Sequence, residues 1–325
     1  MHNFDSLILA TGSRLHFGLF GGKCEQGSSF GGIGAMVEKP GLKLKIEASE
    51  ERRYSGSQSD RLQAFADSWL EFTGHSPEEE FHLSMVESPN SHVGLGTGTQ
   101  IGLSVAAILF QHLLGEIPSL ETLARSVNRG KRSAVGTYGF QHGGFILDQG
   151  KSNSSELAKL GLHCPIPEQW RFVLIQSSNP EGLSGSTEND VFANSAVSMS
   201  EHHDELVRLT KDSILPALYA EDFDTFSESV FEFGKLSGSY FAHIQGGPFN
   251  GPRITKLVES ARQNGIKGVG QSSWGPTVYV MAESDNDANQ ITELMSEFLL
   301  PEESMFVTAP ENSGFRITAV PQATP

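Results

Sequence analysis

The segment from residue 100 to residue 115, QIGLSVAAILFQHLLG, constrains the fold more than any other part of the chain. Ile101, Val105 and Ile108 recur at helical spacing, and most of the other positions are apolar as well. A helix that is apolar on nearly every side is usually buried, because no face of it favours water. We therefore predict a central buried helix that ends near Gly115, since glycine commonly closes a helix.

The segments around this helix show simpler patterns. Alternating apolar residues predict strands at 41–49 and 81–88, because every second side chain of a strand faces the same way. Apolar residues at helical spacing predict a helix at 60–74, between these two strands. A further helix is expected at 119–130, with Ser119 as its N-terminal cap and Gly130 as its stop.

A second structural unit begins with the apolar run 170–177. A chain of 325 residues is too long for one ordinary core, so we predict two domains, residues 1–165 and 166–325. The second should be an antiparallel sheet with helices on one face, which makes the chain an α+β protein. Its expected helices lie at 190–207, 222–236, 254–264 and 287–299, and its further strands at 277–284, 304–310 and 314–320.

Charge and composition argue against several classes of protein. A formal net charge of −16 repels nucleic acid, so no nucleic-acid partner is expected. No apolar run approaches the roughly 20 residues of a membrane span, and the first residues do not resemble a signal peptide. We therefore expect a cytoplasmic protein without a membrane partner. Cys24 and Cys164 lie outside any metal-ligand spacing and are expected to be buried thiols.

The glycine-rich run SHVGLGTGTQ, residues 91–100, directly precedes the central helix. It lacks the lysine of a nucleotide-hydrolysing P-loop, but glycines at every second position let backbone amides curl around an oxyanion at a helix N-terminus. Thr97 and Gln100 fit the spacing of a capping box, so the helix should begin there. A turn that only packs under the second domain is the alternative. The predicted phosphate-binding residues are Gly94, Leu95, Gly96, Thr97, Gly98 and Thr99.

A second loop, in VGQSSWGPTVYVM from Val269, combines glycine and hydroxyl residues before a strand. Such residues suit a hydrogen-bonding loop better than a core, so we predict a substrate contact here. Trp274 could instead serve only for packing, as buried tryptophans often do. The predicted binding residues of this loop are Gln271, Ser272, Ser273 and Trp274.

Charged and titratable residues supply the remaining candidates. Arg14 and His16 would share one face of a strand and could contact an anion, although an exposed strand pair is the alternative. Glu188, near Asp190, could hold Mg²⁺ or could belong to a segment that caps the next helix. His142 has a suitable unperturbed pKa for proton transfer, as have His16 and His92. Arg14, His16 and His142 are the catalytic candidates, and no role is assigned among them.

Five motifs resemble the GHMP kinase superfamily and, within it, the β-ribofuranosylaminobenzene 5'-phosphate synthase family. They are SRLHFGLF (13–20), FGGIGAMVEKPG (30–41), SHVGLGTGTQ (91–100), GTYGFQHGGFILDQG (136–150) and GVGQSSWGPTVY (268–279). The resemblance implies an N-terminal domain of the ribosomal S5 domain 2 type and a ferredoxin-like C-terminal domain. It also implies a homodimer.

The activity implied by this resemblance is a decarboxylative phosphoribosyl transfer in tetrahydromethanopterin biosynthesis. Phosphoribosyl pyrophosphate would react with 4-aminobenzoate or 4-hydroxybenzoate, releasing pyrophosphate and CO₂. Mg²⁺ would assist the departing diphosphate, and no organic cofactor would be needed. Tyr138 or Phe140, together with the loop 271–275, would provide the slot for the ring.

The resemblance to the superfamily leaves two other functions open. An ATP-dependent small-molecule kinase is the first, but Gly136 stands where kinases of this group carry an aspartate that polarises the substrate hydroxyl. A non-catalytic sensor of a phosphorylated ligand is the second. The chain also departs from the synthase pattern, with Phe20–Gly22 where an acidic residue is usual and Ser28–Phe30 where Arg-Val-Asp is usual.

Overall fold

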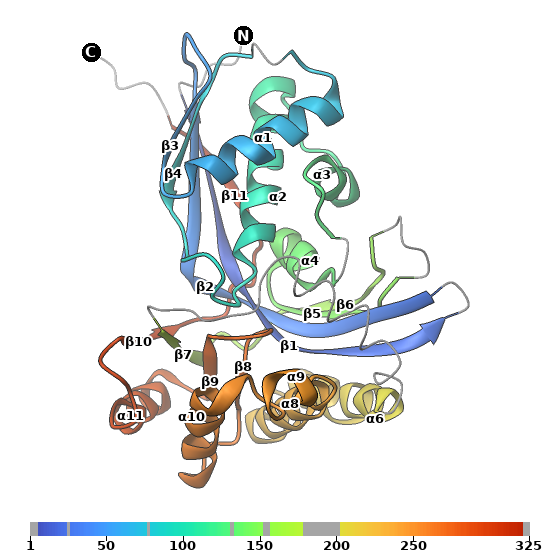
Figure 1. The fold of residues 1–325 in the computed structure, drawn as a ribbon, viewed down its shortest axis with the longest axis vertical. Helices are drawn as coiled ribbons and strands as arrows, with labels where there is room; N and C mark the ends of the chain where they lie inside the picture. Colours follow the sequence, from blue (N-terminus) through green and yellow to red (C-terminus); the bar gives the residue numbers. More distant parts are fainter. Residues whose placement is uncertain are drawn as a thin grey trace.

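Two β-sheets with helices packed against them make up the protein, as seen in a computed structural model (Figure 1). The structure describes residues 6–24, 27–76, 79–130, 133–151, 157–177 and 202–320.

The first sheet has seven strands and is organised around a long antiparallel hairpin. β1 (Ser6–Cys24) pairs with β2 (Gly27–Glu47) along nearly the whole length of both strands. The strand order is β11-β1-β2-β4-β3, while β5 pairs with β2, and β6 with β5. The remaining bounds are Arg53–Gly56 for β3, His82–Glu87 for β4, Phe145–Asp148 for β5, Leu160–Cys164 for β6 and Arg316–Val320 for β11.

The helices of the first domain gather on one side of this sheet (Figure 1). They are α1 (Ser59–Thr73), α2 (Thr97–Leu109), the π-helix η1 (Phe110–Leu114), α3 (Leu120–Ser126) and α4 (Val135–His142). The predicted central helix is confirmed, because α2 is buried along almost its whole length. The stretch Thr97–Leu114 has the length and hydropathy of a membrane span, but 67% of it is buried inside the protein, as in the core helix of a globular domain.

The second sheet has four antiparallel strands in the order β10-β7-β9-β8. β7 (Arg171–Ser177) is followed by helices, then by β8 (Val269–Gln271), β9 (Val278–Ala282), a helix and β10 (Glu303–Thr308). This strand order and connectivity are those of a ferredoxin-like domain, so the predicted α+β class is confirmed. The helices are α6 (His203–Leu209), η3 (Thr210–Ile214), α7 (Leu215–Tyr219), α8 (Phe223–Ser239), α9 (Ala242–Gln245), α10 (Gly251–Gln263) and α11 (Asp285–Ser296). Most of the helix expected at 190–207 lies outside the described residues.

The last strand was expected in the second sheet, and this expectation is wrong. β11 pairs with β1, in a register that places Val320 opposite Ser6. The amide of Phe315 donates to the carbonyl of Phe140, and the two rings stack with centroids 4.4 Å apart. An alternating pattern identifies a strand but does not say which sheet it joins. The chain thus changes sheets between β6 and β7 and crosses back after β10.

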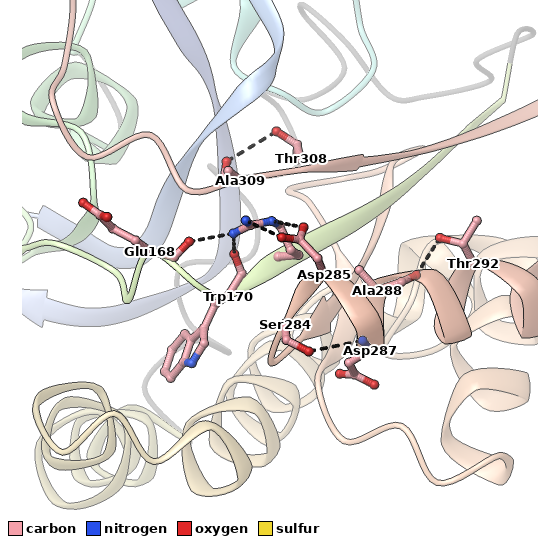
Figure 2. A network of polar contacts seen from close by, with 10 residues as sticks. Glu168, Trp170, Ser284, Asp285, Asp287, Ala288, Thr292, Thr308 and Ala309 are labelled. Carbon is pink, nitrogen blue, oxygen red and sulfur yellow. Dashed lines mark hydrogen bonds and ion pairs between the residues drawn. The ribbon is translucent and has the colours of Figure 1, made fainter.

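The beginning of the second domain is held by a network around Arg171 (Figure 2). The Nε and Nη2 atoms of Arg171 donate to the Asp285 carboxylate, at 2.6 and 2.9 Å, and Nη1 donates to the carbonyls of Glu168 and Trp170. Ser284 caps α11 by accepting from the amide of Asp287. These contacts tie the first strand of the second sheet to the helix that precedes its edge strand.

The two domains also share a hydrophobic core. Leu15 and Ile33 of the long hairpin belong to the same buried cluster as Phe226, Phe233 and Tyr279 of the second domain. A common core fixes the relative position of the two domains, so the surfaces that face each other across their junction are held in place.

Candidate functional site

A cavity of about 670 Å³ lies between the two domains. Residues of β1, the glycine loop and the segment after α3 contribute to it from the first domain. The second domain contributes parts of α8, α9 and the loop after β8. Among the predicted site residues, Arg14, His16, Gly94, Leu95, Gly96, Thr97, Gly98, Thr99, Gln271, Ser273 and Trp274 line it, as does His92.

The charge of this cavity is opposite to the charge of the protein. Arg14, Arg61 and Arg129 line it, and no aspartate or glutamate of the described chain is among the lining residues. The chain as a whole carries a formal charge of −16. A low-dielectric cleft lined by one sign of charge concentrates ions of the other sign. The cavity is therefore suited to a negatively charged small molecule.

Three carbonyl groups of the glycine loop accept hydrogen bonds from the surrounding protein. The Val93 carbonyl accepts a hydrogen bond from Thr277 Oγ1 at 2.6 Å. The Gly94 carbonyl accepts from Ser272 Oγ at 2.7 Å, and the Leu95 carbonyl accepts from the amide of Arg14 at 3.0 Å. Three successive acceptors are thus used by the surrounding protein.

The backbone amides that follow are in the opposite situation. Within the described residues, the amides of Gly96, Thr97 and Gly98 have no hydrogen-bond acceptor, and they open helix α2. Unpaired amides and the positive end of the helix dipole favour an oxyanion. The geometry suits the predicted phosphate site, which stays a prediction.

The capping box predicted for Thr97 and Gln100 does not form. Gly96 is the N-terminal cap, with φ 70°, and Thr97 is already the first helical residue. The Thr97 hydroxyl donates instead to the Asn90 carbonyl, at 3.3 Å. The side-chain Nε2 of Gln100 donates to the Gly136 carbonyl at 2.9 Å. The helix starts where the glycine run ends, as expected, but backbone conformation rather than a side chain sets the start.

The loop after β8 holds the glycine loop in place. Ser272 Oγ bridges the Gly94 carbonyl and the amide of His16, which donates to it at 3.1 Å. Ser272 does not line the cavity, and its hydroxyl holds the glycine loop in place. Trp274 lines the cavity and packs against Phe241, with ring centroids 4.5 Å apart. Phe241 and Phe249 also line the cavity, so the second domain gives it an aromatic contribution.

His16 belongs to a buried polar chain at the edge of the cavity. Its Nε2 lies 3.2 Å from Ser133 Oγ, and the Ser133 side chain hydrogen bonds to the Asp148 carboxylate. Burial, with the Arg14 charge adding to it, lowers the pKa of His16 well below its usual value. Burial raises the pKa of Asp148 to about 6, although Asp148 accepts from the amides of Ala134 and Gly150. His16 is therefore a neutral imidazole at physiological pH.

Several predicted residues lie elsewhere. His142 stacks on His163, with ring centroids 4.9 Å apart, and does not line the cavity. Tyr138 donates to the Ala158 carbonyl, and Phe140 is buried against Phe315, so neither reaches the predicted ring slot. Both side chains extend from α4 to other parts of the first domain and its sheet. Glu188 lies outside the described residues.

Two further observations concern metals and cysteines. No group of three or more His, Cys, Asp or Glu side chains within the described ranges could hold a metal ion. Cys164 is a buried free thiol, as predicted, and burial raises its pKa to about 11. The side chain of Cys24 lies outside the described residues.

Sequence reasoning missed Arg61 and Arg129. Arg61 lies in the first turn of α1, and Arg129 follows α3, so neither is near the glycine loop in the sequence. Both face it in space, since a Cβ atom on Gly98 would lie 2.7 Å from Arg61 Nη2 and 3.4 Å from Arg129 Nη2. No local motif marks either residue, and only the packing of α1, α2 and α3 brings them together.

Comparisons with known proteins agree with this fold. Residues 214–299 match the family model GHMP kinases C terminal. The chain is 28% identical to β-ribofuranosylphenol 5'-phosphate synthase of Methanothermobacter thermautotrophicus, over 89% of this chain and 93% of that protein. It is 29% identical to the enzyme of the same name from Archaeoglobus fulgidus, over 86% of this chain and 88% of that protein.

A solved kinase structure has the same fold over nearly the whole chain. Homoserine kinase from Cytophaga hutchinsonii superimposes with a TM-score of 0.68 over 98% of this chain and 99% of that protein, at 14% identity. At this identity the likeness concerns the fold alone. The relatives that share the sequence over most of its length are synthases, whereas this structural neighbour is a kinase.

Proposed function

We propose that this chain, a relative of the β-ribofuranosylphenol 5'-phosphate synthases with the GHMP kinase fold, catalyses a decarboxylative phosphoribosyl transfer. Phosphoribosyl pyrophosphate would react with a para-substituted benzoate, 4-hydroxybenzoate or 4-aminobenzoate, as a step in tetrahydromethanopterin biosynthesis. The supporting observation is the cavity itself, which combines three arginines and unpaired loop amides with an aromatic contribution from the second domain. The names of the relatives refer to a phenol product, which favours 4-hydroxybenzoate.

The first step of this reaction separates charge. The bond between C1 of the ribose and the diphosphate oxygen breaks, and its electron pair leaves with the diphosphate. The sugar becomes oxocarbenium-like, as in glycoside hydrolysis. Donors already fixed in place stabilise the departing anion without reorganising, and removing one such donor typically lowers the rate roughly 10²- to 10³-fold. Arg14 and the amides of Gly96, Thr97 and Gly98 are the groups proposed for this role.

The second step makes a carbon–carbon bond. The para substituent pushes electron density to the ring carbon that bears the carboxylate, and a π electron pair of the ring bonds that carbon to C1. The C–CO₂ bond then breaks, its electron pair restores aromaticity, and CO₂ leaves. Trp274, Phe241 and Phe249 offer flat apolar surfaces that would hold the ring facing C1, which replaces much of the entropic cost of bringing two reactants together.

Mg²⁺ is proposed only as an ion that accompanies the diphosphate. The described lining residues include no carboxylate, so they do not fit a metal held directly by the protein. Glu188 remains an untested candidate. The charge stabilisation derived above therefore relies on the arginines and amides of this chain.

The decisive experiment follows the carboxyl group. Carboxyl-labelled 4-hydroxybenzoate and 4-aminobenzoate are each incubated with phosphoribosyl pyrophosphate and Mg²⁺, and labelled CO₂ is collected. We expect release from at least one of them and none from 3-hydroxybenzoate, because a meta substituent cannot direct electron density to the reacting carbon. Folded protein that releases no CO₂ from either para compound would refute the proposal. ATP consumption stimulated by an alcohol would favour a kinase, and ligand binding without turnover would favour a sensor.

A further inference from the structure

We propose that Arg61 and Arg129 form a clamp for the outer phosphate of the leaving diphosphate, and so decide which end of the substrate the glycine loop binds. This inference rests on the proposed function and assigns an orientation within the same cavity. Neither residue was a candidate from sequence patterns.

The guanidinium of Arg61 is held in place by neutral groups. Its Nη1 donates to Gln58 Oε1 at 2.7 Å and to Ser91 Oγ at 3.0 Å, and Ser91 Oγ also donates to Gln58 Oε1, at 2.7 Å. Among the ion pairs of the described residues, none includes Arg61. An arginine in a protein stays protonated even though burial lowers its pKa. A half-buried cation with neutral anchors therefore keeps its charge available to a ligand in the cavity.

The second cation, Arg129, lies in the segment that follows α3. The Arg129 guanidinium lies over the ring of Phe65, 4.8 Å from its centroid. Its Nη2 and the Nη2 of Arg61 both face Gly98, where a side chain would contact both. The first domain thus places two guanidiniums beside the first turn of α2 and beside the unpaired amides of the loop.

Arg14 lies on the other flank of the same loop. A Cβ atom on Gly96 would lie 3.0 Å from Arg14 Nε, whereas Gly98 faces Arg61 and Arg129. Cations on both flanks of the loop match two linked phosphate groups better than they match a single phosphate group. A diphosphate ester also carries more negative charge than the 5-phosphate at neutral pH, so it gains more from three arginines. The diphosphate is therefore assigned to the loop, with Arg14 on the phosphate next to C1 and the clamp on the outer phosphate.

The test compares two anions that report on the two ends of the substrate. Binding of inorganic pyrophosphate and of ribose 5-phosphate is measured by calorimetry with the full-length protein, for wild type, Arg61→Gln and Arg129→Gln. Each substitution should weaken pyrophosphate binding roughly 10- to 100-fold, as expected when hydrogen bonds to a charged group are lost. The affinity for ribose 5-phosphate should change less than about twofold, because its phosphate would lie away from both arginines. Arg125→Gln is the matched control, since Arg125 is exposed on α3 and does not line the cavity.

Each outcome supports or overturns the clamp. Unchanged pyrophosphate affinity in both variants, with unchanged thermal unfolding, would overturn it. Equal losses for both anions would also overturn it, because the arginines would then not distinguish the two ends. ADP that binds more tightly than pyrophosphate, with the same dependence on Arg61, would overturn the assignment to the leaving diphosphate, because the loop would then recognise a nucleotide. These binding measurements need no turnover, so absence of CO₂ release would refute the proposed reaction while leaving the clamp to be judged separately.

Discussion

Two loops meet at the cavity, and they look alike in sequence while having different roles. In the glycine loop, residues 91–100, the carbonyls of residues 93–95 are bound by the protein and the amides of residues 96–98 are open. The loop after β8 is also rich in glycine and hydroxyl residues, but Ser272 and Thr277 use their hydroxyls to hold the first loop. One loop is prepared to bind an anion and the other keeps it in shape. The difference shows that the hydrogen bonds a loop has already made indicate its role better than its composition does.

The largest effect that separates the two roles is expected from Gly94→Ala. Gly94 has φ +80°, and a Cβ atom would lie 2.5 Å from the Ser272 carbonyl oxygen and 2.8 Å from that of Gly275. The strained backbone and the clash with main chain should together lower the free energy of unfolding by about 3 kcal/mol or more. Chemical denaturation measures this loss.

Gly98→Ala is the matched control for that substitution. Gly98 has no positive φ, and its nearest contact would be the flexible end of Arg61. The free energy of unfolding should therefore change by less than about 1 kcal/mol, although pyrophosphate binding should weaken. Similar destabilisation by both substitutions would show that the two glycines are equivalent. The distinction between the part of the loop with bound carbonyls and the part with open amides would then be wrong.

Ser272→Ala should produce the next largest effect. It removes a buried hydroxyl that donates to the Gly94 carbonyl and accepts from the His16 amide. Leaving these groups unpaired should cost roughly 1–3 kcal/mol of unfolding free energy, and kcat/KM should fall because the glycine loop loses its support. Ser273→Ala, the neighbour that lines the cavity, should leave stability nearly unchanged. If Ser273→Ala destabilised the protein as much as Ser272→Ala, the support of the glycine loop would not depend on the Ser272 hydroxyl.

Gly136→Asp tests whether the positive charge of Arg14 contributes to anion binding at the glycine loop. A Cβ atom at Gly136 would lie 3.6 Å from Arg14 Nε, at ordinary contact distance, so a side chain fits there. The new carboxylate should neutralise Arg14 and raise the KM for phosphoribosyl pyrophosphate roughly tenfold or more. Gly136→Asn has nearly the same shape without the charge, and its KM should stay close to that of wild type. An equal rise in both variants would assign the effect to size instead of charge.

The sequence predicted the parts of the molecule that depend on local patterns. The buried helix α2 follows from its continuous apolar character, and the glycine run before it indicates the open amides. Ser119 caps α3 by accepting from the Thr122 amide, as expected, although that helix ends at Ser126, four residues before Gly130. In each of these cases the physical cause lies within a few residues of the effect.

The parts that could not be predicted depend on which distant segments pack together. Arg61 and Arg129 reach the loop only through the packing of α1 and α3 against α2, and β11 joins the first sheet although it follows the second in the sequence. Tyr138 was expected at the site because of the motif at 136–150, yet it lies on α4 and its hydroxyl donates to the Ala158 carbonyl. A motif gives the neighbours of a residue along the chain, whereas a site is made by its neighbours in space.

The smallest expected effect concerns His16, whose main chain is hydrogen-bonded to the loop after β8. Its amide donates to Ser272, and its carbonyl accepts from the amide of Ser273. Because burial and then Arg14 lower the pKa of His16, it should stay neutral in the folded protein, and kcat/KM should show no ionisation of His16 between pH 6 and 8. In the unfolded chain the same imidazole takes up a proton below about pH 6.5. The unfolded state then binds more protons than the native state, so the contribution of His16 to stability falls as the pH drops below that value.

Proton NMR of the His16 ring and denaturation at pH 8 and pH 5.5 measure the two sides of this linkage. The ring signal should not titrate near pH 6.5, and His16→Gln should lose less stability than wild type on acidification because it has no imidazole to protonate on unfolding. A ring signal that titrates with a midpoint near 6.5 would contradict both expectations. It would mean that water reaches the His16 ring. The loop after β8 would then hold His16 less tightly than the main-chain hydrogen bonds of His16 with Ser272 and Ser273 imply.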